Sequence, residues 1–152
     1  MNHRTHGIAS RGTEEARQLP TPSPDDARVE VRFKSSRTFR MWRYGVGHSQ
    51  LLLRATPGGA EPRCIDLHFE GVAAVQLGIR YVAPEVLLAT ERERAELEAL
   101  AQSGAGARHI ALALRTEAGT GLVLCRRVRA LLGGTDPFGE VEDSEVLWSH
   151  RA

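Results

Sequence analysis

Hydrophobic and polar residues alternate along the segment in which we expect the folded part of the chain to begin. Over "VEVRFK", Val29, Val31 and Phe33 alternate with charged residues, and this period of two is typical of a half-buried β-strand. Two further strands are predicted over roughly 40–55 and 62–70, and the Pro-Gly-Gly loop in "TPGGAE" between them is typical of a hairpin. We therefore expect an antiparallel pair of strands in this part of the chain.

The pattern after residue 70 predicts one clear helix. Residues 71–90 are apolar but interrupted by glycines and one proline, so one or two short strands are expected there. In "TERERAELEALAQSG", Thr90 can act as the N-cap, and Glu93 three residues later can complete a capping box. This stretch predicts an amphipathic helix that ends at Gly104 or Gly106.

The last third of the chain predicts another hairpin and one further element. "RHIALALRT" and "GLVLCRRVRA" flank the turn "EAGT". Residues 121–132 match both strand and helical spacing, and we favour a strand through about Arg127. The final "GEVEDSEVLWS" is compatible with an acidic edge strand or a short helix, and an exposed edge strand there would allow a symmetric homodimer.

The balance of elements indicates the fold class. Strands outnumber helices and the predicted turns are short, which favours an α+β fold: a mainly antiparallel β-sheet, curled or in two layers, with one amphipathic helix. Residues 1–27 lack periodic apolar positions and contain the proline-rich "LPTPSP", so we expect a disordered N-terminal leader. Residues 28–150 are then predicted to form a single β-rich globular domain.

The charge of the chain bears on which partners are expected. The formal net charge of +1 does not favour bulk attraction to nucleic acid or to an anionic membrane. Among the 20 basic residues only Lys34 is a lysine, and this arginine bias indicates a GC-rich genome rather than phosphate binding. Arg126, Arg127 and Arg129 lie together, but the acidic "EVEDSEV" follows and can pair with them. Neither a nucleic-acid partner nor a membrane partner is expected, and no apolar run approaches the roughly 18–20 residues of a membrane span.

The cysteines and the N-terminal sequence indicate where the protein works. Cys64 and Cys125 lie far apart without the spacing of a metal site, so we expect free thiols in a reducing compartment. The N-terminal segment has no apolar stretch typical of a secretory signal, and a cytoplasmic location is predicted. The glycine-rich segments lack the strand–loop–helix context of a phosphate cradle, and we expect no cofactor.

The stretch "MWRYGVGHSQLLLR", residues 41–54, combines large aromatic residues, a histidine and three leucines. If Leu53 is matched with Ile65 across the predicted hairpin, Leu51 pairs with Leu67, and the apolar side chains share one face. The other face then carries seven residues, which form the predicted binding surface: Trp42, Tyr44, His48, Gln50, Asp66, His68 and Glu70.

Two interpretations of this predicted binding surface involve neither a metal nor acid–base catalysis. The first is a solvent-facing or partly covered sheet surface with ordinary cross-strand polar pairs, such as His48 opposite Glu70. The second is a surface for a ligand or a protein partner, with Trp42 and Tyr44 as rigid anchors of the kind that dominate binding interfaces.

A third interpretation is a metal or acid–base site that uses His48, His68, Asp66 and Glu70, because imidazole and carboxylate groups together suit zinc, iron or manganese. Three of these residues are collinear, about 6.6 Å apart along one strand, and such ligands rarely close a compact shell. We assign no catalytic residue and no metal. The sequence favours a non-enzymatic binding or interaction module, with a small metal-dependent enzyme as the alternative.

The same stretch, with the strand that follows it, resembles a family of small uncharacterised bacterial proteins. The pattern is Trp-x-Tyr-x-Val-Ser/Gly-His-x-x-Leu-Leu-Leu-Arg followed by Ile-Asp-x-x-Phe-x-Gly-Val. The matching positions here are Trp42, Tyr44, Val46, Gly47, His48, Leu51–Arg54, Ile65, Asp66, Phe69, Gly71 and Val72. The resemblance implies a compact β-rich bacterial domain, of the accessory or immunity type found in toxin or defence loci.

Overall fold

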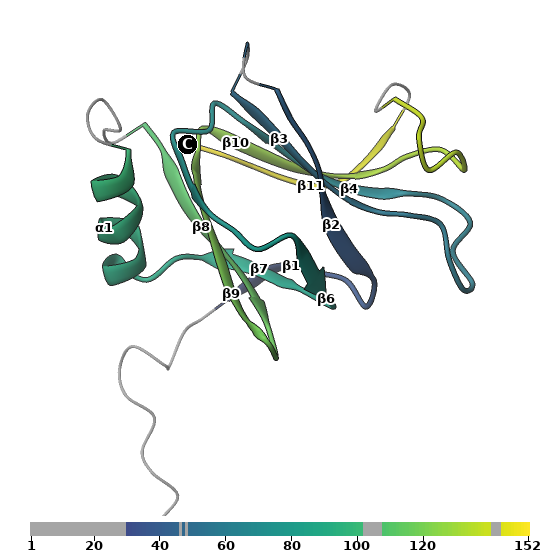
Figure 1. Cartoon of the computed structure of the whole chain (residues 1–152), viewed down its shortest axis with the longest axis horizontal. Coiled ribbons are helices and arrows are strands. Elements are labelled where there is room, and N and C mark those ends of the chain that lie inside the picture. Colours follow the sequence, from purple (N-terminus) through teal and green to yellow (C-terminus); the bar gives the residue numbers. More distant parts are fainter. Residues whose placement is uncertain (1–29, 46, 48, 102–107, 141–143) are drawn as a thin grey trace, which may run out of the picture.

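In the part of the chain that the structure describes, two antiparallel β-sheets and one helix form the fold (Figure 1). The computed structural model describes residues 30–45, 47, 49–101, 108–140 and 144–152, and the predicted leader 1–27 lies outside these ranges. In spatial order, the five-stranded sheet consists of β1 (Val31–Lys34), β7 (Glu85–Leu88), β8 (Ile110–Thr116), β9 (Gly119–Cys125) and β5 (Ala74–Gln76). The six-stranded sheet consists of β11 (Glu145–Arg151), β10 (Arg127–Leu132), β4 (Ile65–Glu70), β3 (Gln50–Ala55), β2 (Thr38–Gly45) and β6 (Arg80–Val82).

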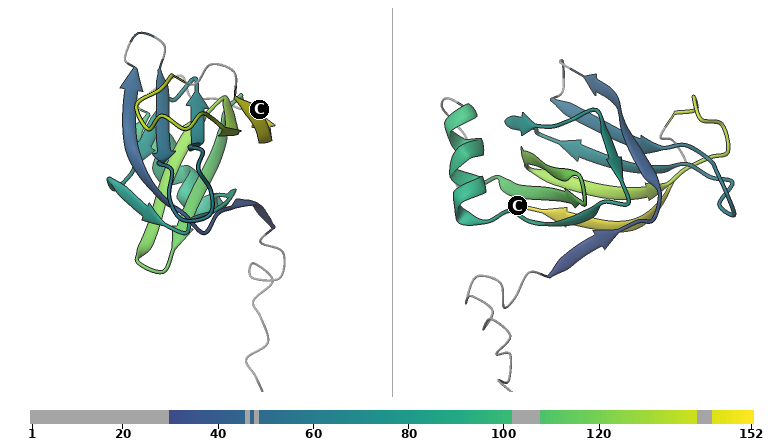
Figure 2. Two further views of the ribbon diagram at one scale, coloured as in Figure 1. Left: turned by 90° about the vertical axis from the view of Figure 1, so that its right-hand side faces the viewer. Right: turned by 60° about the horizontal axis from the view of Figure 1, so that its bottom comes forward.

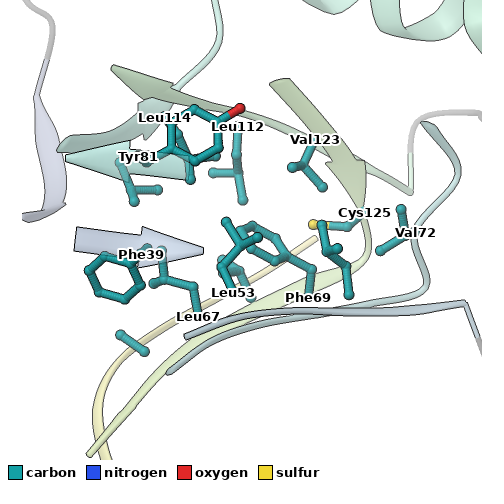
Figure 3. Close-up of a cluster of buried hydrophobic side chains, with 14 of the residues drawn as sticks. Phe39, Leu53, Leu67, Phe69, Val72, Tyr81, Leu112, Leu114, Val123 and Cys125 are labelled. Carbon is teal, nitrogen blue, oxygen red and sulfur yellow. The ribbon is translucent and has the colours of Figure 1, made fainter. Parts of the chain in front are cut away.

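The main hydrophobic core fills the space between the two sheets (Figure 3). Leu53 and Leu67 point into it from the six-stranded sheet, and Leu112 and Val123 meet them from the five-stranded sheet. All four side chains are fully buried, and burial of each contributes about 1.5–3 kcal/mol. The predicted α+β fold with a two-layered antiparallel sheet is confirmed.

The helix α1 (Glu91–Leu100) covers the other face of the five-stranded sheet, away from β2 and β3 (Figures 1 and 2). Its one buried residue, Leu97, packs in a second hydrophobic cluster with Leu87 and Leu122. The protein therefore has three layers: the helix, the five-stranded sheet and the six-stranded sheet.

The predicted start of α1 is confirmed, and its predicted end is wrong. The Thr90 hydroxyl accepts from the Glu93 amide at 3.2 Å, and the Glu93 carboxylate accepts from the Thr90 amide at 3.0 Å, which completes the capping box. The helix ends at Leu100, before the glycines proposed as its stop, and Gly104 and Gly106 lie outside the described residues.

The strand predicted over 40–55 is in fact two strands, β2 and β3. They pair with each other, with Gly45 opposite Gln50, so the chain reverses within the stretch that the sequence analysis treated as continuous. Ser49, just before β3, has a φ of 49°, in the left-handed region typical of turns. The glycines of "YGVGHS" indicate a turn. The prediction of one continuous strand followed the alternation of apolar residues instead.

The other ambiguous segments are all strands. Residues 71–90 contain three short strands, β5, β6 and β7, rather than one or two. Residues 121–132 contain most of β9 and all of β10. At Arg126 the chain leaves the five-stranded sheet and continues as β10 in the six-stranded sheet. The final segment is a strand, β11, at the edge of the six-stranded sheet, as one of the two alternatives proposed.

The predicted register between β3 and β4 is wrong by two residues. Leu53 lies opposite Leu67 rather than Ile65, and Leu51 lies opposite Phe69. Because side chains alternate with a period of two, a shift of two residues keeps the same side chains on the same face. Leu51 and Leu53 are accordingly buried, at 1% and 0% exposure.

Two predictions about location are tested in part. Within the described part of the chain, no helix has the length and apolarity needed to cross a membrane. Cys64 and Cys125 are buried free thiols, as expected, and burial raises the pKa of Cys125 to about 12.

Candidate functional site: the outer face of the six-stranded sheet

The candidate site lies on the outer face, which we define as the face of the six-stranded sheet turned away from the five-stranded sheet. Alternate residues of β3, β4 and β10 point to this face, with Arg54 opposite Asp66 and Leu52 opposite His68. The face is partly covered, because Leu52 and Leu131 retain only 3% and 2% exposure.

A buried ion pair between Arg54 and Asp66 lies at the centre of the covered part. Arg54 Nε donates to Asp66 Oδ1 at 2.7 Å, and a second guanidinium nitrogen donates to Oδ2 at 3.0 Å. Both side chains are at most 3% exposed, and the hydrogen bonds to Asp66 raise the pKa of Arg54. The third guanidinium nitrogen donates to the carbonyls of Pro137 and Gly139 at 3.0 and 2.8 Å. The pair therefore holds the β10–β11 loop against the sheet.

Two aromatic rings, which we call the aromatic pair, lie beside this ion pair. The Trp42 ring packs on Arg54, whose guanidinium carbon is 5.6 Å from the ring centroid. The Phe138 ring lies 5.8 Å from Trp42, tilted by 40°. Phe138 is 81% exposed. The backbone around it forms a turn, in which the Asp136 carboxylate accepts from the Phe138 amide and the Asp136 carbonyl accepts from the Gly139 amide.

A β-bulge places Trp42 on the outer face. The register between β2 and β3 shifts between Met41 and Arg43, so Trp42 is an extra residue in the strand. Beyond the bulge, Tyr44 lies opposite the core-facing Leu51. The prediction that Tyr44 shares a face with Trp42 is therefore wrong, because the extra residue reverses the alternation.

His68 is buried among charged side chains. It is 8% exposed, and burial lowers its pKa, with Arg129 and Arg43 acting in the same direction and Glu70 opposing them. Its Nδ1 accepts from a guanidinium nitrogen of Arg129 at 3.0 Å. Its Nε2 then faces the side-chain amide oxygen of Gln50, Oε1, at 3.4 Å. Both ring nitrogens thus have protein partners.

Glu70 is shared by two arginines of β10. Its carboxylate oxygens lie 3.6 Å from Arg127 and 3.4 Å from Arg129. With Asp66 paired to Arg54, the carboxylates predicted as candidate metal ligands are engaged by guanidinium groups. No group of three potential ligands for a metal ion occurs among the residues that the structure describes.

A small depression lies next to His68. Its volume is about 260 Å³, and it is lined by Arg43, Gly45, Gly47, Gln50, Leu52 and His68. Pockets for small organic ligands have volumes of about 300–1,000 Å³. This depression is smaller, so it is better suited to contact with another surface than to enclosing a ligand.

Of the seven residues predicted for the binding surface, the structure places five on the outer face: Trp42, Gln50, Asp66, His68 and Glu70. Tyr44 lies on the other side, and His48 lies outside the described residues. Arg54 and Phe138 also belong to this site, and neither was among the predicted residues. Arg54 could have been found, because it lies two residues from Leu52 and so shares its face, whereas nothing in the sequence linked Phe138 to Trp42.

No protein-family model, curated protein or solved structure matches this chain. The function is therefore inferred from the geometry of the outer face.

Proposed function

We propose that this protein is a non-enzymatic binding module that recognises another protein through the aromatic pair, Trp42 and Phe138. The partner offers an apolar pocket that receives the Phe138 ring. The observation that carries the proposal is the 81% exposure of Phe138 on a loop that the buried Arg54 side chain holds through two hydrogen bonds.

The support matters because binding is weakened by the entropy of ordering the side chains and loops that make contact. Here Arg54 joins Asp66 to two carbonyls of the loop, and Trp42 packs against both Arg54 and Phe138. The loop is held before any partner arrives. Aromatic anchors of this kind contribute most of the binding energy in protein interfaces.

The polar surroundings of the aromatic pair also suit a protein interface. Arg43 and Glu140 form an exposed ion pair at 3.4 Å, with side chains 54% and 69% exposed. Arg43 and Glu140 line one shallow depression together with Trp42, Arg54 and Phe138. This depression is distinct from the one next to His68. An apolar centre with a charged rim is the usual arrangement of an interface between proteins.

The contacts of His68, Asp66 and Glu70 do not favour the alternative, a small metal-dependent enzyme. Each of these side chains already has an arginine partner. We place the binding role in the cytoplasm, and the two buried free thiols support that placement.

The experiment compares partner binding by the full chain and by a Phe138→Ala variant. Each protein is immobilised, exposed to a lysate of the source organism, and any captured protein is purified and titrated against both. We expect the partner to bind Phe138→Ala about 30-fold more weakly, because loss of a central anchor costs about 2 kcal/mol.

The control variant is Leu100→Ala, which removes an exposed apolar side chain from α1 at the other side of the molecule. We expect it to bind the partner like the wild type. A partner that binds Phe138→Ala and the wild type equally, or the absence of any protein that binds the wild type, would contradict the proposal.

A further inference from the structure

Four arginines line a second concave surface, which we call the arginine hollow. It lies at the Glu70 end of β4. There the ends of β4 and β11 meet Arg126, which connects β9 to β10. Its volume is about 610 Å³, and its lining includes Glu70, Gly71, Arg108, Arg126, Arg127 and Arg151.

Arginine side chains outnumber acidic side chains in the lining of the arginine hollow, which also includes Ala152. Glu70 is the one acidic side chain in its lining, and its carboxylate is already shared by Arg127 and Arg129. Within the part of the chain that the structure describes, the side chains of Arg108, Arg126 and Arg151 form no ion pair or hydrogen bond.

The backbone around the arginine hollow is held by hydrogen bonds between three segments. The Arg126 amide donates to the Glu70 carbonyl at 3.0 Å, and the Ala152 amide donates to the Arg126 carbonyl at 2.9 Å. The ends of β4 and β11 are therefore fixed on either side of Arg126. A rigid scaffold of this kind lowers the entropy lost when a ligand binds.

Gly71 leaves room for the Arg126 side chain. A Cβ at position 71 would lie 2.9–3.0 Å from the first three carbons of the Arg126 side chain, closer than such atoms approach in proteins. Gly71 also has a φ of 62°, in the left-handed region that favours glycine. The absence of a side chain at this position thus allows the Arg126 stem to lie directly against the backbone.

We propose that the arginine hollow binds a small ligand that carries a phosphate group, such as a phosphate monoester or a diphosphate. A planar carboxylate is satisfied by one guanidinium fork, whereas a phosphate directs oxygens to several sides and carries more charge. Guanidinium groups from separate segments around one hollow match the phosphate better.

The size of the arginine hollow favours a small ligand over nucleic acid. Its volume lies within the range of about 300–1,000 Å³ typical of small-molecule sites. A nucleic acid would need basic residues along an extended path, and the net charge of the chain is only +1. The proposal concerns a different surface from the aromatic pair, so the two can be tested separately.

The test is calorimetric titration of the full chain, without a C-terminal tag, at about 0.15 M salt. The probes are inorganic phosphate, pyrophosphate, glycerol phosphate, citrate and a short single-stranded DNA. We expect pyrophosphate or glycerol phosphate to bind with a Kd below about 1 mM, and citrate to bind at least about tenfold more weakly. Tight binding of inorganic phosphate alone would identify the free anion as the source of the phosphate group.

Matched variants assign the binding to the arginine hollow. Arg126→Gln and Arg151→Gln are expected to weaken pyrophosphate binding at least about tenfold, because each removes a charge-assisted contact. Arg92→Gln, at a 92% exposed side chain on α1, is expected to leave it unchanged. Failure of all phosphate probes to bind, equal binding of citrate, or DNA binding tighter than that of every small probe would overturn the proposal. Equal effects of Arg92→Gln and Arg126→Gln would also overturn it.

Discussion

At the scale of single residues, Arg54 determines what the outer face can do. Its guanidinium group makes two hydrogen bonds to Asp66 and two to loop carbonyls while nearly excluded from water. A buried ion pair of this kind adds little stability relative to apolar side chains of the same size, but the loss of one partner is costly. We infer that the pair serves to hold the β10–β11 loop rather than to stabilise the fold.

Asp66→Ala and a matched double variant test whether the ion pair stabilises the fold. The variant leaves the Arg54 charge buried without its partner, and we expect the free energy of unfolding to fall by about 3–5 kcal/mol in chemical denaturation. The double variant Arg54→Met, Asp66→Leu removes both charges and is expected to recover most of that loss. A double variant as unstable as Asp66→Ala would show that the ion pair itself stabilises the fold.

At the scale of elements, the sequence predicted those whose local signals agree and failed where two signals compete. Thr90 and Glu93 define the start of α1 by the chemistry of their own side chains, and that start is confirmed. In "YGVGHS", the apolar alternation of the flanking strands outweighed two glycines, so one strand was predicted where a hairpin forms. The bulge at Trp42 depends on pairing with β3, which no local pattern specifies.

Glu93 links α1 to the five-stranded sheet, and this link gives a pH-dependent prediction. Its two carboxylate oxygens accept from Arg115 on β8 at 2.8 and 3.0 Å, and these bonds, with the Thr90 amide, lower the pKa of Glu93 to about 2. At about pH 7 we expect Glu93→Gln to lower the free energy of unfolding by about 1.5–3 kcal/mol.

A carboxyl group whose pKa is lowered by folding stabilises the protein above its unfolded pKa of 4.5. That stabilisation is lost as the pH falls towards about 2. The difference between wild type and Glu93→Gln should therefore shrink when urea denaturation is repeated at about pH 3. Glu96→Gln, in an exposed pair with Arg92, is the control and should change stability by less than about 1 kcal/mol. A Glu93→Gln effect that is constant with pH would contradict the assignment.

At the scale of the whole molecule, the three layers separate the core from the surfaces that we propose as functional. The inner faces of both sheets are apolar and enclosed, while the outer face carries the aromatic pair near one end of β4 and the arginine hollow lies at the other. Strand β10 contributes to both regions, since Arg127 lines the hollow and the loop that follows β10 carries Phe138.

The sequence could predict this division only in part. The period of two assigned Asp66, His68 and Glu70 to the face opposite the core even though the register was wrong, because a shift of two residues preserves faces. The contact between Trp42 and Phe138 joins residues almost a hundred positions apart. It depends on the course of a loop, and a loop without periodic residues gives no such information in the sequence.

In the free protein, the Phe138 ring is held against Trp42, where a partner can reach it. Nuclear Overhauser effects between the protons of these two rings test it most directly. We expect clear cross-peaks between the Trp42 indole and the Phe138 ring in the wild-type protein without any partner, since the ring centroids are 5.8 Å apart. Assigned spectra that lack any such cross-peak would contradict it.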